Sequence, residues 1–159
     1  MKIKVIAIGK IKEDYWRVAI KNYLNRLSLY TTFEVVEIKE EPIPTPLTPL
    51  LEVKYKLKEG SKILNKIKKD DFVVLLDPKG VAKDSIQFSQ FVDELLMISK
   101  KQIIFVIGGS LGLSPEVLLR ANEVISLGKL TFTHQMARVI LLEQIYRAFK
   151  IKRGETYHK

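Results

Sequence analysis

The sequence predicts an open α/β fold built on a largely parallel sheet. Two observations lead to this prediction. First, short aliphatic runs alternate with amphipathic segments over short connections. Second, residues 71–77 and 103–107 are almost continuously aliphatic, which is typical of strands that helices cover on both faces of a parallel sheet. No internal repeat, low-complexity tract or domain boundary is present, so we expect a single domain over residues 1–159.

The first half of the chain is predicted to hold two strands and two helices. The strands are aliphatic runs, and the helices carry apolar side chains at helical spacing. Residues 40–49 contain four prolines, which lack an amide donor, so we expect an irregular and mobile connector there. The second helix is rich in lysine, with its apolar stripe at Leu50, Val53, Leu57, Leu64 and Ile67. The predicted strands are 2–8 and 33–38, and the predicted helices are 12–30 and 49–68.

The second half repeats a strand-then-helix pattern three times. Pro78, Lys79 and Gly80 are expected to break the first strand. The three helices each begin at a residue that can cap a helix, namely Asp84 or Ser85, Ser114 and Thr133. A polar tail, KRGETYHK, ends the chain. The predicted strands are 71–77, 103–107 and 123–127, and the helices reach about residues 98, 121 and 150.

The charge of the chain points to a polyanionic partner. There are 27 Lys and Arg residues against 18 Asp and Glu residues, a formal net charge of +9. Such a field attracts RNA, DNA or anionic membrane surfaces, and charge alone leaves all three open. Lysines are densest in residues 54–69, where they form either a contact surface for phosphates or an ordinary solvated helix face.

Composition excludes several classes of site. The chain has no cysteine and only two histidines, His134 and His158, which argues against thiolate nucleophiles, iron–sulfur clusters and structural zinc. We therefore expect no metal. The amino terminus reads as a strand rather than a signal peptide, and no run approaches the ~20 apolar residues of a membrane span. The expectation is a soluble, cytoplasmic protein that does not associate with membranes.

The carboxyl ends of three predicted strands mark the expected ligand site, because ligands of open α/β sheets bind outside those ends. These ends are Leu76-Asp77-Pro78, Ile107-Gly108-Gly109 and Leu127-Gly128-Lys129. The motif IGGSLGLSP at the second end matches neither common nucleotide-binding glycine pattern. It allows either a tight turn or a close backbone approach to a ligand. The apolar residues 127–132 are either a buried connection or a wall around a flat apolar ligand such as adenine.

The last helix and the tail allow similar alternatives. Residues 133–150 are apolar nearly all round, which predicts a homodimer through this helix unless other helices of the same chain cover it. Glu143 and Arg147 have the spacing of a surface ion pair. His134, at the helix start, is more typical of a capping or packing residue than of a catalytic one. Tyr157, His158 and Lys159 are either a frayed end or a group able to stack on a base, accept a proton and balance charge.

Four segments together resemble one known family. They are KIKVIAIGKIKEDYW, FVIGGSLGLS, LGKLTFTHQMARVILLEQIYRAFKI and RGETYHK. They resemble the small SPOUT-class, trefoil-knotted methyltransferases that methylate ring nitrogen three of a pseudouridine in large-subunit (23S) ribosomal RNA. The resemblance implies a parallel-sheet α/β knot in which the chain end is threaded through a loop, which general topology rules would not predict.

The resemblance also implies partners and site residues. It implies a homodimer that acts on 23S rRNA within assembled ribosomes, with the tail of one subunit reaching the pocket of the other. It implies Tyr157, His158 and Lys159 as candidates for substrate contact in trans, and on chemical grounds we add Arg138 to them as a candidate catalytic residue. The implied cofactor is S-adenosyl-L-methionine, bound by Leu76, Gly108, Leu127, Gly128, Lys129, Leu130, Thr131 and Phe132.

For the chemistry, we hypothesise that His158 or a bound water accepts the proton of the nucleophilic nitrogen. Lys159, Arg138 or Arg153 would then stabilise the developing anion, and Lys129 would do so from the cofactor loop. Two rival functions remain at this point. One is a non-catalytic, basic RNA-binding or ribosome-associated protein, and the other is a knotted methyltransferase that acts on transfer RNA.

Overall fold

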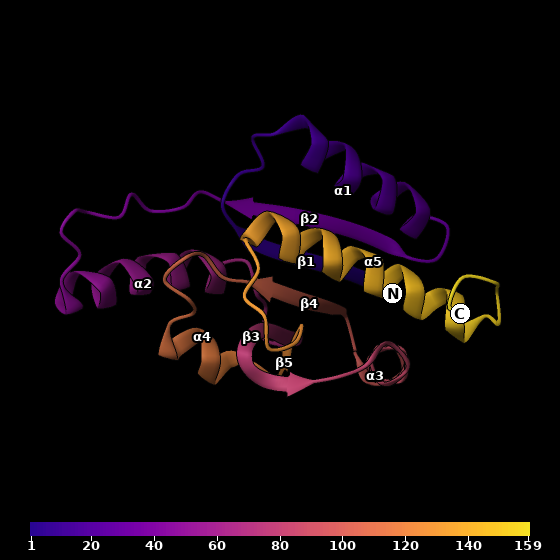
Figure 1. Ribbon diagram of the computed structural model, residues 1–159. Coiled ribbons are helices and arrows are strands. Elements are labelled where there is room, and N and C mark those ends of the chain that lie inside the picture. Colours follow the sequence, from indigo (N-terminus) through magenta and orange to yellow (C-terminus); the bar gives the residue numbers. More distant parts are fainter.

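All five strands lie in one parallel sheet (Figure 1). The computed structural model describes residues 1–159. The strand order is β2-β1-β4-β3-β5, and every neighbouring pair is parallel. The predicted parallel α/β sheet is therefore confirmed, and the knotted threading stays a prediction of the family resemblance. The strands are β1 (Lys2–Ile8), β2 (Thr32–Ile38), β3 (Phe72–Ala82), β4 (Gln102–Ile107) and β5 (Glu123–Ser126).

Helices cover both faces of the sheet. One face packs against α1, α3 and α5, and the other packs against α2 and α4. Strand β4 is buried on both faces because it lies at the centre of the sheet, which explains its continuous aliphatic run. None of the helices combines the length and apolar composition needed to cross a membrane. The helices are α1 (Asp14–Leu27), α2 (Pro49–Leu64), α3 (Ser85–Ile98), α4 (Pro115–Arg120) and α5 (His134–Lys152).

Side-chain caps set the start of the three later helices, as their sequences predict. Asp84 and Gln87 form a capping box at α3. The hydroxyls of Ser114 and Thr133 accept hydrogen bonds from the backbone N–H groups of Val117 and Met136, respectively, at 3.4 Å each. These caps fix where α4 and α5 begin, and both starts follow directly from loops at the carboxyl edge of the sheet.

Strand β3 does not end at Pro78 as expected. It continues to Ala82 through an irregularity in its pairing with β5, between Leu76 and Val81. Gly80 makes this pairing possible, because a Cβ atom there would lie 2.6 Å from the backbone carbonyl carbon of Ile125. The proline therefore lies in a bulge of the strand rather than at its end.

Helix α2 departs from its predicted packing. Leu50, Val53 and Leu57 were expected in the buried stripe, yet they are 81%, 57% and 42% exposed. Burial begins only at Glu59 and Gly60, where α2 meets α4. Figure 1 shows the first turns of α2 extending beyond the body of the molecule.

Helices of the same chain cover much of α5. It lies beside α1 and α3, and its buried side chains belong to the larger core cluster. Intramolecular packing therefore accounts for much of the apolar character of α5, while Val139 and Ile140 are only half-buried. The homodimer stays a prediction that rests on the family resemblance.

Candidate functional site

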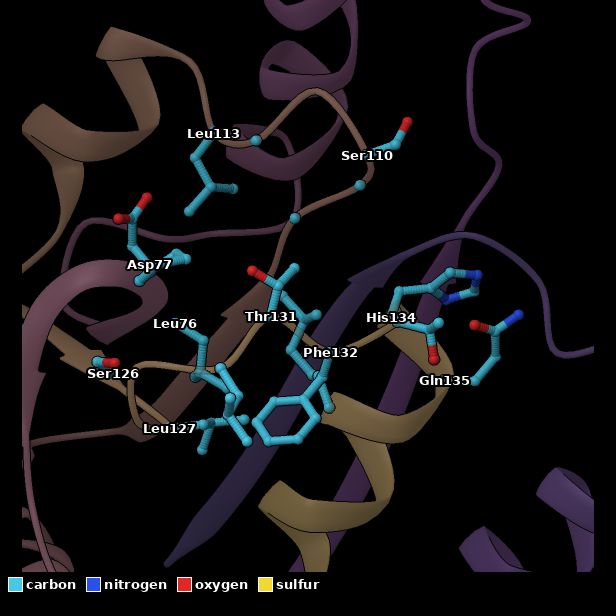
Figure 2. Close-up of a pocket in the computed structure, with 18 of the residues that line it drawn as sticks. Leu76, Asp77, Ser110, Leu113, Ser126, Leu127, Thr131, Phe132, His134 and Gln135 are labelled. Atoms are coloured by element: carbon cyan, nitrogen blue, oxygen red, sulfur yellow. The ribbon is translucent and has the colours of Figure 1, made fainter.

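A cavity of about 700 Å³ opens at the carboxyl ends of β3, β4 and β5 (Figure 2). Its lining comes from all three strand ends that the sequence marked, together with the first turn of α5. Seven of the eight residues expected to bind a cofactor line this one cavity: Leu76, Gly108, Leu127, Gly128, Leu130, Thr131 and Phe132.

One side of the cavity is apolar. Figure 2 shows Leu76, Leu127 and Phe132 grouped together, with Leu113 across the opening. Leu130 also belongs to the lining although its side chain is 75% exposed. Branched aliphatic and aromatic side chains that line one side of a cavity favour binding of a flat, apolar group.

The glycine motif after β4 is both a tight turn and a cavity wall. The N–H of Gly112 donates to the carbonyl oxygen of Gly109 at 3.1 Å, and Gly112 has a φ of 81°. A Cβ atom on Gly109 would lie 2.9 Å from Cγ2 of Ile8. The motif therefore needs glycine for two reasons: Gly109 lies too close to Ile8 for a side chain, and Gly112 has a positive φ.

The loop after β5 forms a second wall. The hydroxyl of Ser126 accepts a hydrogen bond from the N–H of Gly128 at 3.0 Å and donates to its carbonyl oxygen at 2.7 Å. Leu130 and Thr131 are exposed, so the interpretation of 127–132 as a buried connection is wrong. Residues of this loop line the cavity, and their contact with a flat apolar ligand stays a prediction. Lys129 is exposed and lies outside the lining, which separates it from the other residues expected to bind the cofactor.

The opposite side of the cavity is polar, and sequence reasoning missed Glu40 and Gln135 there. Glu40, Ser110 and Gln135 line the cavity, and the hydroxyl of Ser110 donates to Oε1 of Glu40 at 3.2 Å. Asp77, which lies beside Leu76 in Figure 2, adds a second carboxylate to the lining and accepts a hydrogen bond from the N–H of Lys79 at 2.8 Å. Nothing local marks Glu40 as a site residue, because it follows β2, whose end the sequence did not assign to the ligand site.

His134 occupies the boundary between this polar side and the core. Burial lowers its pKa, and the nearby Arg138 guanidinium lowers it further. Both effects favour the neutral imidazole. The ring packs on Gly9 at the end of β1, as expected for a packing histidine, while the residue also lines the cavity.

Arg138 does not line the cavity. Its side chain is 1% exposed, and it donates to Oε2 of Glu37 at 2.7 Å and to the carbonyl oxygen of Gly9 at 3.1 Å. Burial alone would raise the pKa of Glu37, but the hydrogen bonds from Arg138 and from the N–H of Ile11 lower it. This position does not support the expected contact between Arg138 and a substrate.

The tail folds back on α5 instead of fraying. The Tyr157 hydroxyl donates to Oε1 of Glu143 at 3.0 Å, and Arg147 lies over the Tyr157 ring at 4.6 Å. Nη1 of Arg147 also contacts Nδ1 of His158 at 3.2 Å. Arg147 lies about 20 Å beyond His134 along α5, at ~1.5 Å per residue. The structure therefore does not bring His158 or the exposed Lys159 to the cavity of their own chain.

Comparison with known proteins gives consistent full-length matches. A family model described as "Predicted SPOUT methyltransferase" matches residues 1–158. A protein of Carboxydothermus hydrogenoformans is 49% identical over 159 residues, and one of Bacillus cytotoxicus is 50% identical over 159 residues. Each match covers 100% of both chains, and both relatives are named "Ribosomal RNA large subunit methyltransferase H". A relative from Bacillus thuringiensis with the same name is 48% identical over the same length.

Proposed function

Because the chain belongs to the SPOUT methyltransferase family, we propose that it transfers a methyl group from S-adenosylmethionine to ring nitrogen three of a pseudouridine in 23S ribosomal RNA. The names of the relatives supply the large-subunit RNA, and the resemblance supplies the donor and the target atom. The observation that carries the proposal is the single cavity shared by three strand ends and the first turn of α5. We assign the whole of residues 1–159 to one such domain.

The lining of the cavity fits the proposed donor. Its apolar side, with Leu76, Leu127 and Phe132, suits an adenine ring. The carboxylates of Glu40 and Asp77 lie on the same cavity and favour a positively charged ligand. When bound, S-adenosylmethionine would supply an activated methyl carbon on a cationic sulfur. The glycines of the motif and Gly128 would let the backbone approach the donor closely.

A second subunit completes the proposed site. The tail of each chain is held about 20 Å along α5 from the start of its own helix, at ~1.5 Å per residue. A partner subunit related by two-fold symmetry would bring its own tail to this cavity. Tyr157, His158 and Lys159 of one subunit would then face the donor held by the other. We place this homodimer in the cytoplasm, where assembled ribosomes supply the RNA.

The tail contacts limit which group accepts the proton. A guanidinium only donates hydrogen bonds, so Nδ1 of His158 accepts from Arg147 and the neutral ring carries its proton on Nε2. In this arrangement neither ring nitrogen has a free lone pair. His158 can act as a base only after this contact opens, and a bound water remains the alternative acceptor.

Only some of the cationic side chains proposed to stabilise the developing anion are free to do so. Arg138 is engaged with Glu37, and the Arg153 guanidinium lies over the Tyr30 ring at 4.4 Å. Lys159 and Lys129 are exposed and therefore free to approach a substrate. With the nucleophilic nitrogen held roughly 3–3.5 Å from the methyl carbon and in line with its bond to sulfur, positioning contributes most of the catalysis.

Transfer of labelled methyl groups from S-adenosylmethionine tests the function. Assembled ribosomes, free 23S rRNA and transfer RNA are incubated separately with the protein and labelled donor. We expect label in 23S rRNA, most strongly from ribosomes. Label in transfer RNA alone would support the rival enzyme. If isothermal titration with S-adenosylmethionine gave no heat and no RNA were labelled, the protein would be a binding module instead.

A further inference from the structure

The carboxylate of Glu37 joins two parts of the chain that are far apart in sequence. Its Oε2 atom accepts from Nη1 of Arg138 at 2.7 Å and from the N–H of Ile11 at 2.8 Å. The other terminal nitrogen of Arg138 donates to the carbonyl oxygen of Gly9 at 3.1 Å. Arg138 in the second turn of α5 is thus bonded to the ends of both β1 and β2.

Gly9 receives a second contact from the same helix. A Cβ atom at this position would lie 2.7 Å from Cε1 of His134, so only glycine lets the imidazole pack on the backbone. Its φ of 104° also favours glycine. Arg138 and His134 are one turn apart on α5, so together they fix both the position and the rotation of its first turns on β1.

These turns adjoin the cavity. Thr133, His134 and Gln135 line it, and the loop 127–132 leads directly into them. Because one end of that loop is held by β5 and the other by α5, any movement of the α5 start moves the cavity wall. The Arg138–Glu37–Gly9 contact therefore acts on the cavity through the backbone, without touching a ligand.

Stability alone is a weak reason for this arrangement. Arg138 is 1% exposed and Glu37 is 35% exposed, and replacing both partners of a buried ion pair with apolar side chains of similar volume is often neutral or stabilising. The ion pair instead fixes the orientation of α5 on the sheet, because the guanidinium of Arg138 must meet two acceptors at once, and few placements of the helix allow this. We propose that Arg138 is a positioning residue for the donor site, which it serves by fixing the start of α5 and hence the loop 127–132 against the sheet. This inference rests on the proposed function.

The test compares donor binding with folding stability. Arg138→Met keeps the length of the side chain but loses both hydrogen bonds, and Arg138→Lys keeps the charge. Arg120→Met is the matched control, because Arg120 also bonds to backbone carbonyls, those of Lys68 and Asp71 at 2.8 and 2.9 Å, but lies outside the cavity lining. Isothermal titration gives the Kd for S-adenosylmethionine, urea unfolding gives the midpoint, and methylation assays give KM and kcat.

Arg138→Met should weaken donor binding about tenfold to a hundredfold, since small misplacements of a site are costly. Its unfolding midpoint should fall, because the change leaves the Glu37 carboxylate and the Gly9 carbonyl without their donor. The donor Kd is therefore compared with that of Arg120→Met, which is destabilised in the same way. The KM for the donor should rise more than kcat falls. Arg138→Lys should recover part of the affinity. Arg120→Met should lower the midpoint and leave the donor Kd unchanged.

Two results would overturn the inference. One is a donor Kd of Arg138→Met within twofold of the wild type, and the other is an equal loss of donor affinity in Arg120→Met. If Arg138→Met does not fold, Glu37→Leu replaces it, because it removes the acceptor for Arg138 at a side chain that is 35% exposed, and the same Kd criterion applies. Failure of the wild type to bind S-adenosylmethionine would instead overturn the proposed function, and this inference with it.

Discussion

The hydroxyl of Tyr157 donates to Oε1 of Glu143 at 3.0 Å, so the chain end is bonded to the middle of α5. The same carboxylate oxygen accepts from Nε and Nη2 of Arg147, at 3.0 and 2.6 Å. Burial and the hydrogen bond to Glu143 raise the pKa of Tyr157 to about 12, so its hydroxyl stays a donor at physiological pH. These hydrogen bonds hold the tail against α5 in an ordered conformation.

Tyr157→Phe removes the hydroxyl and keeps the ring. Because a hydrogen bond to a charged group contributes about 1.5–3 kcal/mol, we expect the methylation rate of ribosomes to fall about tenfold to a hundredfold while the donor Kd stays constant. The measurement is kcat with isothermal titration in parallel. Tyr15→Phe, at an exposed position on α1, is the control and should match the wild type. An unaltered rate in Tyr157→Phe would show that this hydrogen bond has no part in catalysis.

Alkaline pH should weaken the fold through the same tyrosine. The folded pKa of Tyr157 is about 12, above the usual value of 10.0, so the folded state holds this proton more tightly than the unfolded state. The stabilisation is fully present below pH 10, and it is lost as the pH rises from there through 12. Urea unfolding between pH 9 and 12 should show a steeper loss of stability for the wild type than for Tyr157→Phe. Parallel curves for the two proteins would contradict the assignment.

A substitution at Gly128 tests whether the loop 127–132 contributes to donor binding, because it strains the backbone of that loop without causing a clash. The φ of Gly128 is 121°, and nothing lies within 4 Å of a Cβ atom built there, so Gly128→Ala adds strain without a clash. We expect a loss of about 1–3 kcal/mol in stability together with weaker donor binding. Gly154→Ala is matched, because Gly154 also has a positive φ, 64°, and open space. It should lose stability but keep its donor Kd. Equal donor affinity in both variants would argue against this wall.

Mixing two inactive variants tests the shared site. One carries Gly128→Ala with Phe132→Ala and lacks a working donor site, and the other carries Tyr157→Phe with His158→Ala and lacks a working tail. In a homodimer with sites made from two chains, co-refolded protein should recover about a quarter of wild-type activity, because half of the dimers are mixed and each has one intact site. Activity no higher than the sum of the separate variants would contradict a site built in trans.

Local patterns were sufficient for most elements of the fold. Strand β4 and the caps at Asp84, Ser114 and Thr133 depend on neighbouring residues and were predicted correctly. The extension of β3 past Pro78 was missed, because it depends on a contact between Gly80 and Ile125 that no local pattern contains. The exposure of Leu50 was missed for a related reason, since helical spacing shows which residues share a face but not whether another element covers it.

The candidate site likewise contains residues that the sequence predicted and residues that only the fold reveals. The strand-end rule located Leu76, Gly108 and Leu127, because parallel strands bring their carboxyl ends to one edge. It gave no indication of Glu40, which reaches the cavity from the end of β2. The position of Arg138 was equally hidden, because its partner Glu37 lies on another element and only the fold brings the two together.

The most direct test of the account is mass spectrometry of nucleosides from 23S rRNA, after incubation of ribosomes with the protein and S-adenosylmethionine. One ribosome preparation contains its pseudouridines, and the other comes from cells that lack the synthase forming them. We predict one new methyl group, on ring nitrogen three of a pseudouridine, in the first preparation and a much smaller yield in the second. A methyl group on another atom, on another nucleotide or on no nucleotide at all would contradict the account.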